Sequence, residues 1–171
     1  MRRLIMTAVL TIALLGAVPV AGTANEGVVG DLELLGEVGI ATGTLFDGVE
    51  VGGISAIAHV GGDSYLALSD DRSEIAPARF YDLEIDVSDG SLDEGDVAIV
   101  DSTELSTPGF GSFPPLSIDP EGLAIGRGGS IYISSEGDAL AGLGPFVNKF
   151  GPDGRQAGRL PVDDHFAPGL D

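Results

Sequence analysis

Residues 54–71 read ISAIAHVGGDSYLALSDD, and this stretch decides the fold class. Two short apolar runs flank the turn Gly-Gly-Asp at 61–63. Apolar runs of this length on either side of a glycine turn predict a β-hairpin. Because Asp70 and Asp71 directly follow the second run, we expect acidic side chains at the end of that strand.

The same pattern recurs 66 positions later, in residues 120–137 (PEGLAIGRGGSIYISSEG). In both copies a strand, a glycine turn and a second strand lead to a serine and a carboxylate, and Asp70 falls on Glu136. Such self-similarity predicts one supersecondary unit used twice, although so short a match also arises by chance. A spacing of 66 exceeds the roughly 40–50 residues of a propeller blade, and the long hairpin and loop at 79–115 account for the surplus.

The rest of the chain also has the character of β-structure. Residues 79–87 alternate apolar and polar positions at a period of two, and 96–105 return as their partner strand. The loop 106–115 is expected to be ordered by Phe110 and Phe113. Further strands are expected at Leu32–Val38, Thr44–Val49 and Phe146–Phe150 and from about Gln156, with a turn at Phe46-Asp47-Gly48. Since no window after residue 24 has sustained helical periodicity, the fold class is all-β.

Residues 1–24 (MRRLIMTAVLTIALLGAVPVAGTA) have the organisation of a signal peptide. Arg2 and Arg3 precede an apolar stretch, and small residues lead to a cleavage site that we expect after Ala24. A retained membrane anchor is the alternative, but the apolar stretch is shorter than the ~20 residues that a span needs. The prediction is therefore a secreted protein, extracellular or periplasmic, with one domain at 25–171 and no stable membrane insertion after cleavage.

Charge and cysteine content exclude several functions. Acidic residues outnumber basic ones 27 to 8, and the net charge is −19. Such a chain repels phosphate backbones, so we expect no nucleic-acid partner. Because there is no cysteine, disulfides, zinc–thiolate sites and thiol nucleophiles are excluded. The acidity suits either divalent cations or a solvated surface.

Four carboxylates stand where predicted strands begin or end, beside glycine, proline or serine: Asp70, Asp119, Glu121 and Glu136. In a propeller such positions face the central axis or its rim, so side chains from different blades converge. Converging carboxylate oxygens suit Ca²⁺, which they bind at about 2.3–2.6 Å. Arg72 and Arg79 are alternative partners, or cations for a substrate phosphate. Taken singly, Asp and Ser at strand ends also serve turns and caps.

Seven segments in order resemble the family called "esterase-like activity of phytase", or phytase-like. They are GGISAIAH, YLALSDDRS, ARFYDLEID, DPEGLAI, IYISSEGD, PFVNKFGPDGR and LPVDDHFAP, which together span about residues 50–168. The resemblance implies a β-propeller-like domain, export, and hydrolysis of phosphoesters or other esters. The positions that match the recurrent motifs of the family are Asp70, Asp71, Arg79, Asp119, Glu121, Gly122, Glu136 and Gly137.

Members of this family usually extend further, and residues 25–171 provide only two to three blades, whereas a closed propeller needs at least about four. We therefore expect an incomplete propeller, either part of a longer protein or completed by another copy. Its open strand edges favour self-association.

Two main functions follow from these observations. The first is a secreted hydrolase acting on a small ester or phosphoester, in which Asp70, Asp119, Glu121 and Glu136 hold Ca²⁺. Glu121 and Glu136 act there as ligands or general base, and Arg79 contacts the substrate anion. The second is a non-catalytic, calcium-stabilised envelope propeller that binds a protein or glycan. A lactone-opening enzyme is a third reading of the same propeller.

Overall fold

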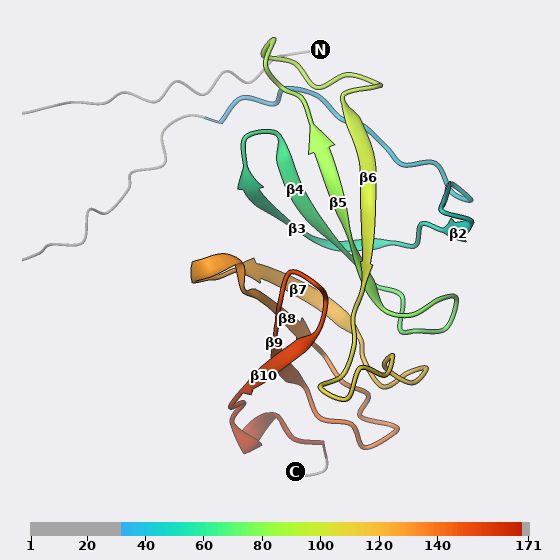
Figure 1. Cartoon of the computed structure of the whole chain (residues 1–171), viewed down its shortest axis with the longest axis vertical. Coiled ribbons are helices and arrows are strands. Elements are labelled where there is room, and N and C mark those ends of the chain that lie inside the picture. The colour runs from blue at the N-terminus through green and yellow to red at the C-terminus, as the bar shows by residue number, and fades with distance from the viewer. Residues whose placement is uncertain (1–31, 169–171) are drawn as a thin grey trace, which may run out of the picture.

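The computed structural model describes residues 32–168 and builds this part of the chain from β-strands (Figure 1). The predicted signal peptide, its cleavage site after Ala24 and the first residues of the predicted domain lie outside the described residues. The described strands are β1 (Leu45–Phe46), β2 (Val49–Glu50), β3 (Ile54–Gly61), β4 (Ser64–Ser69), β5 (Arg79–Ile85), β6 (Val97–Glu104), β7 (Pro120–Ile125), β8 (Ile131–Ser135), β9 (Phe146–Phe150) and β10 (Gln156–Leu160). Two short 3-10 helices, η1 (Arg127–Gly129) and η2 (Asp164–Phe166), complete the list. The all-β prediction is confirmed.

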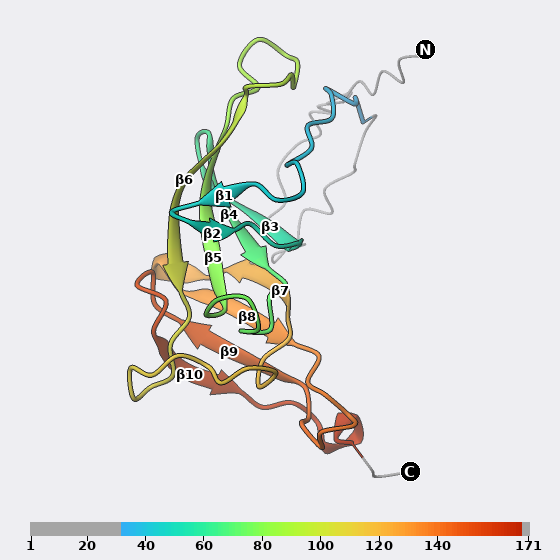
Figure 2. The ribbon, with the colours of Figure 1, turned by 90° about the vertical axis from the view of Figure 1, so that its right-hand side faces the viewer.

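Two antiparallel four-stranded sheets dominate the structure, with strand orders β3-β4-β5-β6 and β10-β9-β8-β7. Each is a meander in which strands adjacent in sequence are paired, as in a propeller blade. The two sheets lie one above the other in Figures 1 and 2. Two blades agree with the predicted incomplete propeller-like fold. Within residues 32–168, no helix has the length and hydropathy needed to cross a membrane.

The internal repeat is visible in the strand pairing. The β3–β4 and β7–β8 hairpins begin 66 positions apart, at Ile54 and Pro120. Each has a register shift at its first strand, between Ile54 and Ala56 in one and between Pro120 and Gly122 in the other. This shared irregularity at equivalent positions supports the interpretation that one hairpin unit is used twice.

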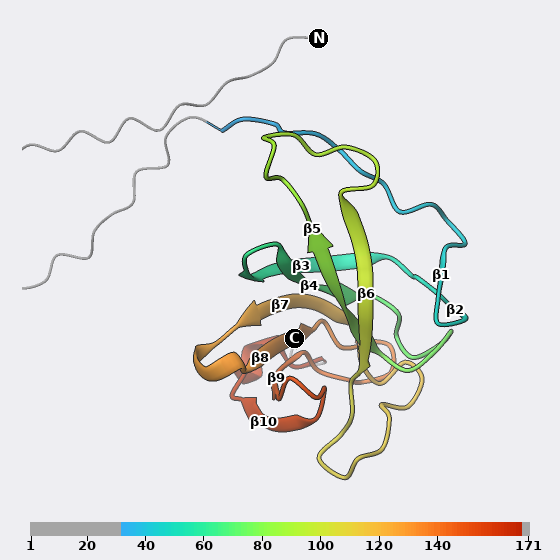
Figure 3. The ribbon, with the colours of Figure 1, turned by 45° about the horizontal axis from the view of Figure 1, so that its top comes forward.

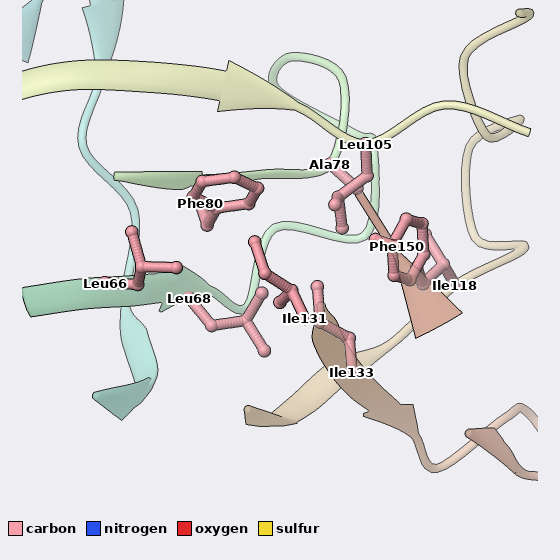
Figure 4. Packing of buried hydrophobic residues seen from close by; sticks show 9 residues of the cluster. All are labelled: Leu66, Leu68, Ala78, Phe80, Leu105, Ile118, Ile131, Ile133 and Phe150. Atoms are coloured by element: carbon pink, nitrogen blue, oxygen red, sulfur yellow. The ribbon is translucent and has the colours of Figure 1, made fainter. Parts of the chain in front are cut away.

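An apolar core holds the sheets face to face (Figure 4). The alternation of β4 and β5 directs Leu66, Leu68 and Phe80 toward the second sheet, where they meet side chains of β8 and β9. Burying each such side chain stabilises the fold by about 1.5–3 kcal/mol. The buried members of this core are Leu66, Leu68, Ala78, Phe80, Leu105, Ile118, Ile131, Ile133 and Phe150.

The opposite face of the first sheet packs against the β1–β2 hairpin, which Figure 2 shows beside β4 and β5. The ring of Phe46 stands edge-on to that of Tyr81, with centroids 6.4 Å apart. The predicted turn is formed, with left-handed φ angles at Asp47 (50°) and Gly48 (79°), which suits a two-residue hairpin. The strand predicted at Leu32–Val38 is wrong. Its leucines stay exposed and only one bridge, at Gly36, is made, because no neighbouring strand covers them.

A connection at the outer edge ties the sheets together. After β6 the chain reaches Ser106, whose amide donates to the Gly154 carbonyl (2.9 Å) and whose carbonyl accepts from Gln156 (2.9 Å). Gly154 has a φ of 72°, and a Cβ there would collide with the Glu104 carbonyl. Only glycine fits this position, so the turn between β9 and β10 is built around the end of β6.

Candidate functional site

The structure brings the four predicted carboxylates to one end of the two sheets. Asp70 follows β4 of the first sheet, whereas Asp119, Glu121 and Glu136 stand at the start of β7 and the end of β8 in the second. β3 and β7, which both begin at this end, lie side by side (Figure 3). We call Asp70, Asp119, Glu121 and Glu136 the carboxylate cluster.

Glu121 occupies a β-bulge. Pro120 pairs with Ser135 and Gly122 with Ser134, so Glu121 is the extra residue between them. A bulge changes the direction of a side chain relative to a regular strand. The equivalent bulge in the first sheet holds Ser55, whose hydroxyl donates to the Pro120 carbonyl (2.8 Å). The two bulges therefore meet, and the contact between sheets is made at the residue preceding Glu121.

The electrostatic surroundings of Glu121 join both sheets. Glu121 is an exposed residue, and a small loss of solvent around its carboxyl, followed by the charges of Asp119, Glu136 and Asp70, raises the pKa of Glu121. Three other carboxylates, one of them from the first sheet, are thus close enough to disfavour the ionised form of Glu121. A glutamate with a raised pKa exchanges protons closer to neutral pH than an ordinary one does.

Arg72 is the cation bound to this end of the sheets. Its Nη2 donates to Oδ2 of Asp138 (3.1 Å), and its Nε lies 3.6 Å from Oδ2 of Asp119. The pKa of Asp138 is lowered by the backbone amide of Ala141 and then by Arg72. Because the Nε is buried without a hydrogen-bond acceptor, the guanidinium is less than fully satisfied. Arg72 therefore links the loop after β4 to both ends of the β7–β8 hairpin.

Arg79 lies elsewhere and is buried. Its Nη1 donates to Asp71 (3.2 Å) and to the Pro77 carbonyl, its Nε to the hydroxyl of Tyr81, and its Nη2 to the Glu50 carbonyl. All three nitrogens are engaged inside the protein. This placement gives Arg79 a structural role, and its contact with a substrate anion stays a prediction.

Asp71 is the buried partner of Arg79. Burial alone would raise the pKa of Asp71, but amide hydrogen bonds from Ala76, Glu74 and Ile75, together with Arg79, outweigh burial and leave the pKa lowered. A carboxylate that accepts three backbone hydrogen bonds organises the loop 72–78. These contacts give Asp71, one of the family-motif positions, a role in stabilising the fold.

A family model described as "Phytase-like: Esterase-like activity of phytase" matches residues 49–171. The chain belongs to this family. The match covers both four-stranded sheets and the whole carboxylate cluster of the phytase-like chain. No curated protein and no solved structure matches the chain significantly.

The fit of a metal ion to this phytase-like site is a separate question. Carboxylates are the donors that Ca²⁺ prefers. Yet among residues 32–168 no three acidic or histidine side chains are gathered closely enough to hold a metal ion. The arrangement does not fit a formed metal site, and calcium stays a prediction.

Two contributors to the site escaped the sequence prediction, namely Ser55 and Asp138. The repeat contains a signal for both, because a shift of 66 places Ser55 on Glu121 and Arg72 on Asp138. Ser55 bonds to Pro120, the residue before its equivalent, and Arg72 bonds to its own equivalent, Asp138. Applying this offset to Glu121 and to Arg72, which the sequence had already singled out, gives the equivalent positions Ser55 and Asp138.

Proposed function

We propose that this phytase-like chain hydrolyses esters, with Glu121 as the general base that accepts a proton from the attacking water. The observation that supports the proposal is the placement of Glu121 on a bulge, with carboxylates of both sheets around it. Bulges next to active sites commonly redirect a side chain toward the reacting groups. The family match favours hydrolase chemistry in general terms.

The neighbouring carboxylates have a defined task in this proposal. A general base works best when its pKa lies near the working pH, and Asp119, Glu136 and Asp70 move the pKa of Glu121 in that direction. Glu136 and Asp70 are repeat-equivalent, so the two hairpins supply one carboxylate each from corresponding positions. The Nε of Arg72 lies 3.6 Å from Asp119, and this ion pair favours the ionised form of one of these neighbours.

Nucleophilic attack by water on the acyl or phosphoryl centre is the step in which Glu121 takes part. Glu121 removes a proton as the water oxygen bonds to the ester carbon or phosphorus, and the alcohol leaves with a proton from solvent. General base catalysis of this kind contributes about 10²–10⁴-fold to the rate. Glu121→Gln, which keeps the size and removes the basic oxygen, should lose a factor in that range.

The test uses p-nitrophenyl acetate, p-nitrophenyl butyrate and p-nitrophenyl phosphate, each with EDTA and with added CaCl₂. Glu84→Gln is the matched control, because Glu84 is an exposed glutamate of β5 outside the carboxylate cluster. The proposal expects turnover by the wild type and by Glu84→Gln, and loss in Glu121→Gln. Equal rates in both variants, or no turnover of any substrate, would refute it. Calcium that raises the melting temperature without turnover would favour the binding protein instead.

We also propose that the protein is exported and cleaved after Ala24. The support is the order of charged, apolar and small residues at 1–24. Amino-terminal sequencing of protein recovered from the medium or periplasm should begin at Asn25. Recovery of the uncleaved chain in the membrane fraction would contradict this proposal.

A further inference from the structure

A cavity of about 330 Å³ lies between the two sheets, away from the carboxylate cluster. It is lined where β3 and β7 end, at Val60 and Ile125, and where β4 and β8 begin, at Ser64 and Ile131. The carboxylate cluster stands at the other end of these same strands. Figures 1 and 3 show the β3–β4 turn and η1, which flank this end, on the same side of the molecule. The cavity is therefore separate from the proposed catalytic site.

The walls of this inter-sheet cavity are mainly apolar. Leu66, Phe80 and Ile131 form its floor and are almost fully buried, while Val60 and Pro152 stand at its rim. Its volume falls at the small end of the range of about 300–1,000 Å³ for ligand pockets. Apolar walls with a small number of polar groups are typical of small-molecule sites.

One carboxylate interrupts the apolar lining. Asp82 of β5 is half-buried, and Asp101 of β6 stands directly opposite it in the sheet. Like charges in directly opposed positions destabilise a sheet. Among the described residues, no basic side chain forms an ion pair with Asp82 and no donor forms a hydrogen bond with its carboxylate. Burial and then the charge of Asp101 raise the pKa of Asp82, in keeping with this arrangement.

We propose that the inter-sheet cavity binds a small organic cation, a protonated amine attached to an apolar body, with Asp82 as its anionic partner. The apolar body lies against Leu66, Phe80 and Ile131, and the ammonium lies between the wall and the Asp82–Asp101 pair. Such a ligand supplies the positive charge and the hydrogen-bond donor that the Asp82 carboxylate lacks, whereas Asp101 already accepts from the Ser102 amide (2.8 Å). Charge complementarity distinguishes this cation from neutral or anionic molecules of equal size, which do not offset the repulsion between the Asp82 and Asp101 carboxylates.

A charge series tests the proposal on the unmodified chain. The probes are 2-phenylethylammonium, 2-phenylethanol and 3-phenylpropanoate, which share an apolar ring and differ in charge. Two-dimensional amide NMR titrations locate each probe. We expect the ammonium to shift resonances of β4, β5 and β8 at the cavity and to bind at least about tenfold more tightly than the alcohol, with no binding of the carboxylate. Equal affinity for the three probes, absence of ammonium binding, or shifts confined to the carboxylate cluster would each overturn it.

Variants separate the cavity from the general acidity of the chain. Asp82→Asn should weaken ammonium binding about tenfold and leave binding of the alcohol unchanged. Asp164→Asn, in η2, removes the same charge from an exposed position that does not line the cavity, and should bind the ammonium like the wild type. If both variants lose affinity equally, attraction by the net charge explains the binding and the proposed site is wrong. Should Asp82→Asn fail to fold, Asp101→Asn gives the same comparison, with a smaller loss expected.

Discussion

Removal of the Arg79 guanidinium should destabilise the protein and leave its chemistry intact. The side chains of Arg79 and Asp71 are 4% and 2% exposed, and their ion pair is 3.2 Å long. Breaking a buried pair by removing one partner costs about 3–5 kcal/mol, because the other charge is left uncompensated. Asp71 keeps its hydrogen bonds from Glu74, Ile75 and Ala76, so the lower end of that range, about 3 kcal/mol, applies to Arg79→Ala.

The assay is urea unfolding followed by circular dichroism, combined with a double-mutant cycle. Arg79→Ala, Asp71→Asn and the double variant should give a coupling free energy of about 1 kcal/mol or more, since the two groups are in contact. Arg127→Ala, at an exposed cation of η1, should change stability by less than about 0.5 kcal/mol. If Arg79→Ala unfolds like the wild type but loses ester turnover, Arg79 binds substrate and the structural role assigned to it is wrong.

Three further predictions concern the fold. Because the pKa of folded Asp71 lies below its ordinary value of 3.8, its ionisation stabilises the protein above about pH 4, and this contribution is lost as the pH falls further. The free energy of unfolding between pH 5 and 3 should therefore fall less steeply in Asp71→Asn than in the wild type. Parallel curves for the two proteins would contradict this. Gly154→Ala should cost about 2 kcal/mol or more, measured by urea unfolding, against about 1 kcal/mol for Gly142→Ala, because both glycines have a φ of 72° but only Gly154 meets a carbonyl. Ile133→Ala, in the core between the sheets, should lower stability by about 2–5 kcal/mol in the same assay, and a smaller loss would indicate that the sheets do not pack as described.

The hairpins were predictable because their signals are local. Alternation at a period of two, interrupted by glycine turns, locates β3 to β6 and the β7–β8 repeat without knowledge of the tertiary structure. The prediction of a strand at Leu32–Val38 is wrong because strand pairing is not a local property. A strand needs a partner, and its sequence does not specify one.

Strand register and burial determine two features of the site that the sequence does not specify, namely the bulge at Glu121 and the interior position of Arg79. Acidic residues at strand ends indicated that Asp70, Asp119, Glu121 and Glu136 would share one end of the sheets, and the effect of the other three on the pKa of Glu121 is consistent with that grouping. The bulge at Glu121 depends on the register with β8 and has no signature in the sequence. Arg79 and Arg72 looked alike as cations near acidic motifs, and only packing shows that one of them is internal.

The loop 106–115 shows the same limit. Phe113 packs against the core as expected, but Phe110 is 72% exposed and has a left-handed φ of 66°. The guanidinium of Arg155 lies 3.8 Å from the centre of its ring. A cation stacked on the aromatic face takes the place of burial for this residue. Sequence reasoning assigned both phenylalanines to the interior, since it has no means of seeing a stacking partner in a distant turn.

The pH dependence of kcat/KM for ester hydrolysis, compared between the wild type and Glu136→Gln, tests the role of Glu121 most directly. Removing the neighbouring charge should shift the acid limb of the profile to lower pH while turnover persists, because Glu121 then ionises more easily. An acid limb at the same pH in both proteins would contradict the assignment of Glu121 as the base.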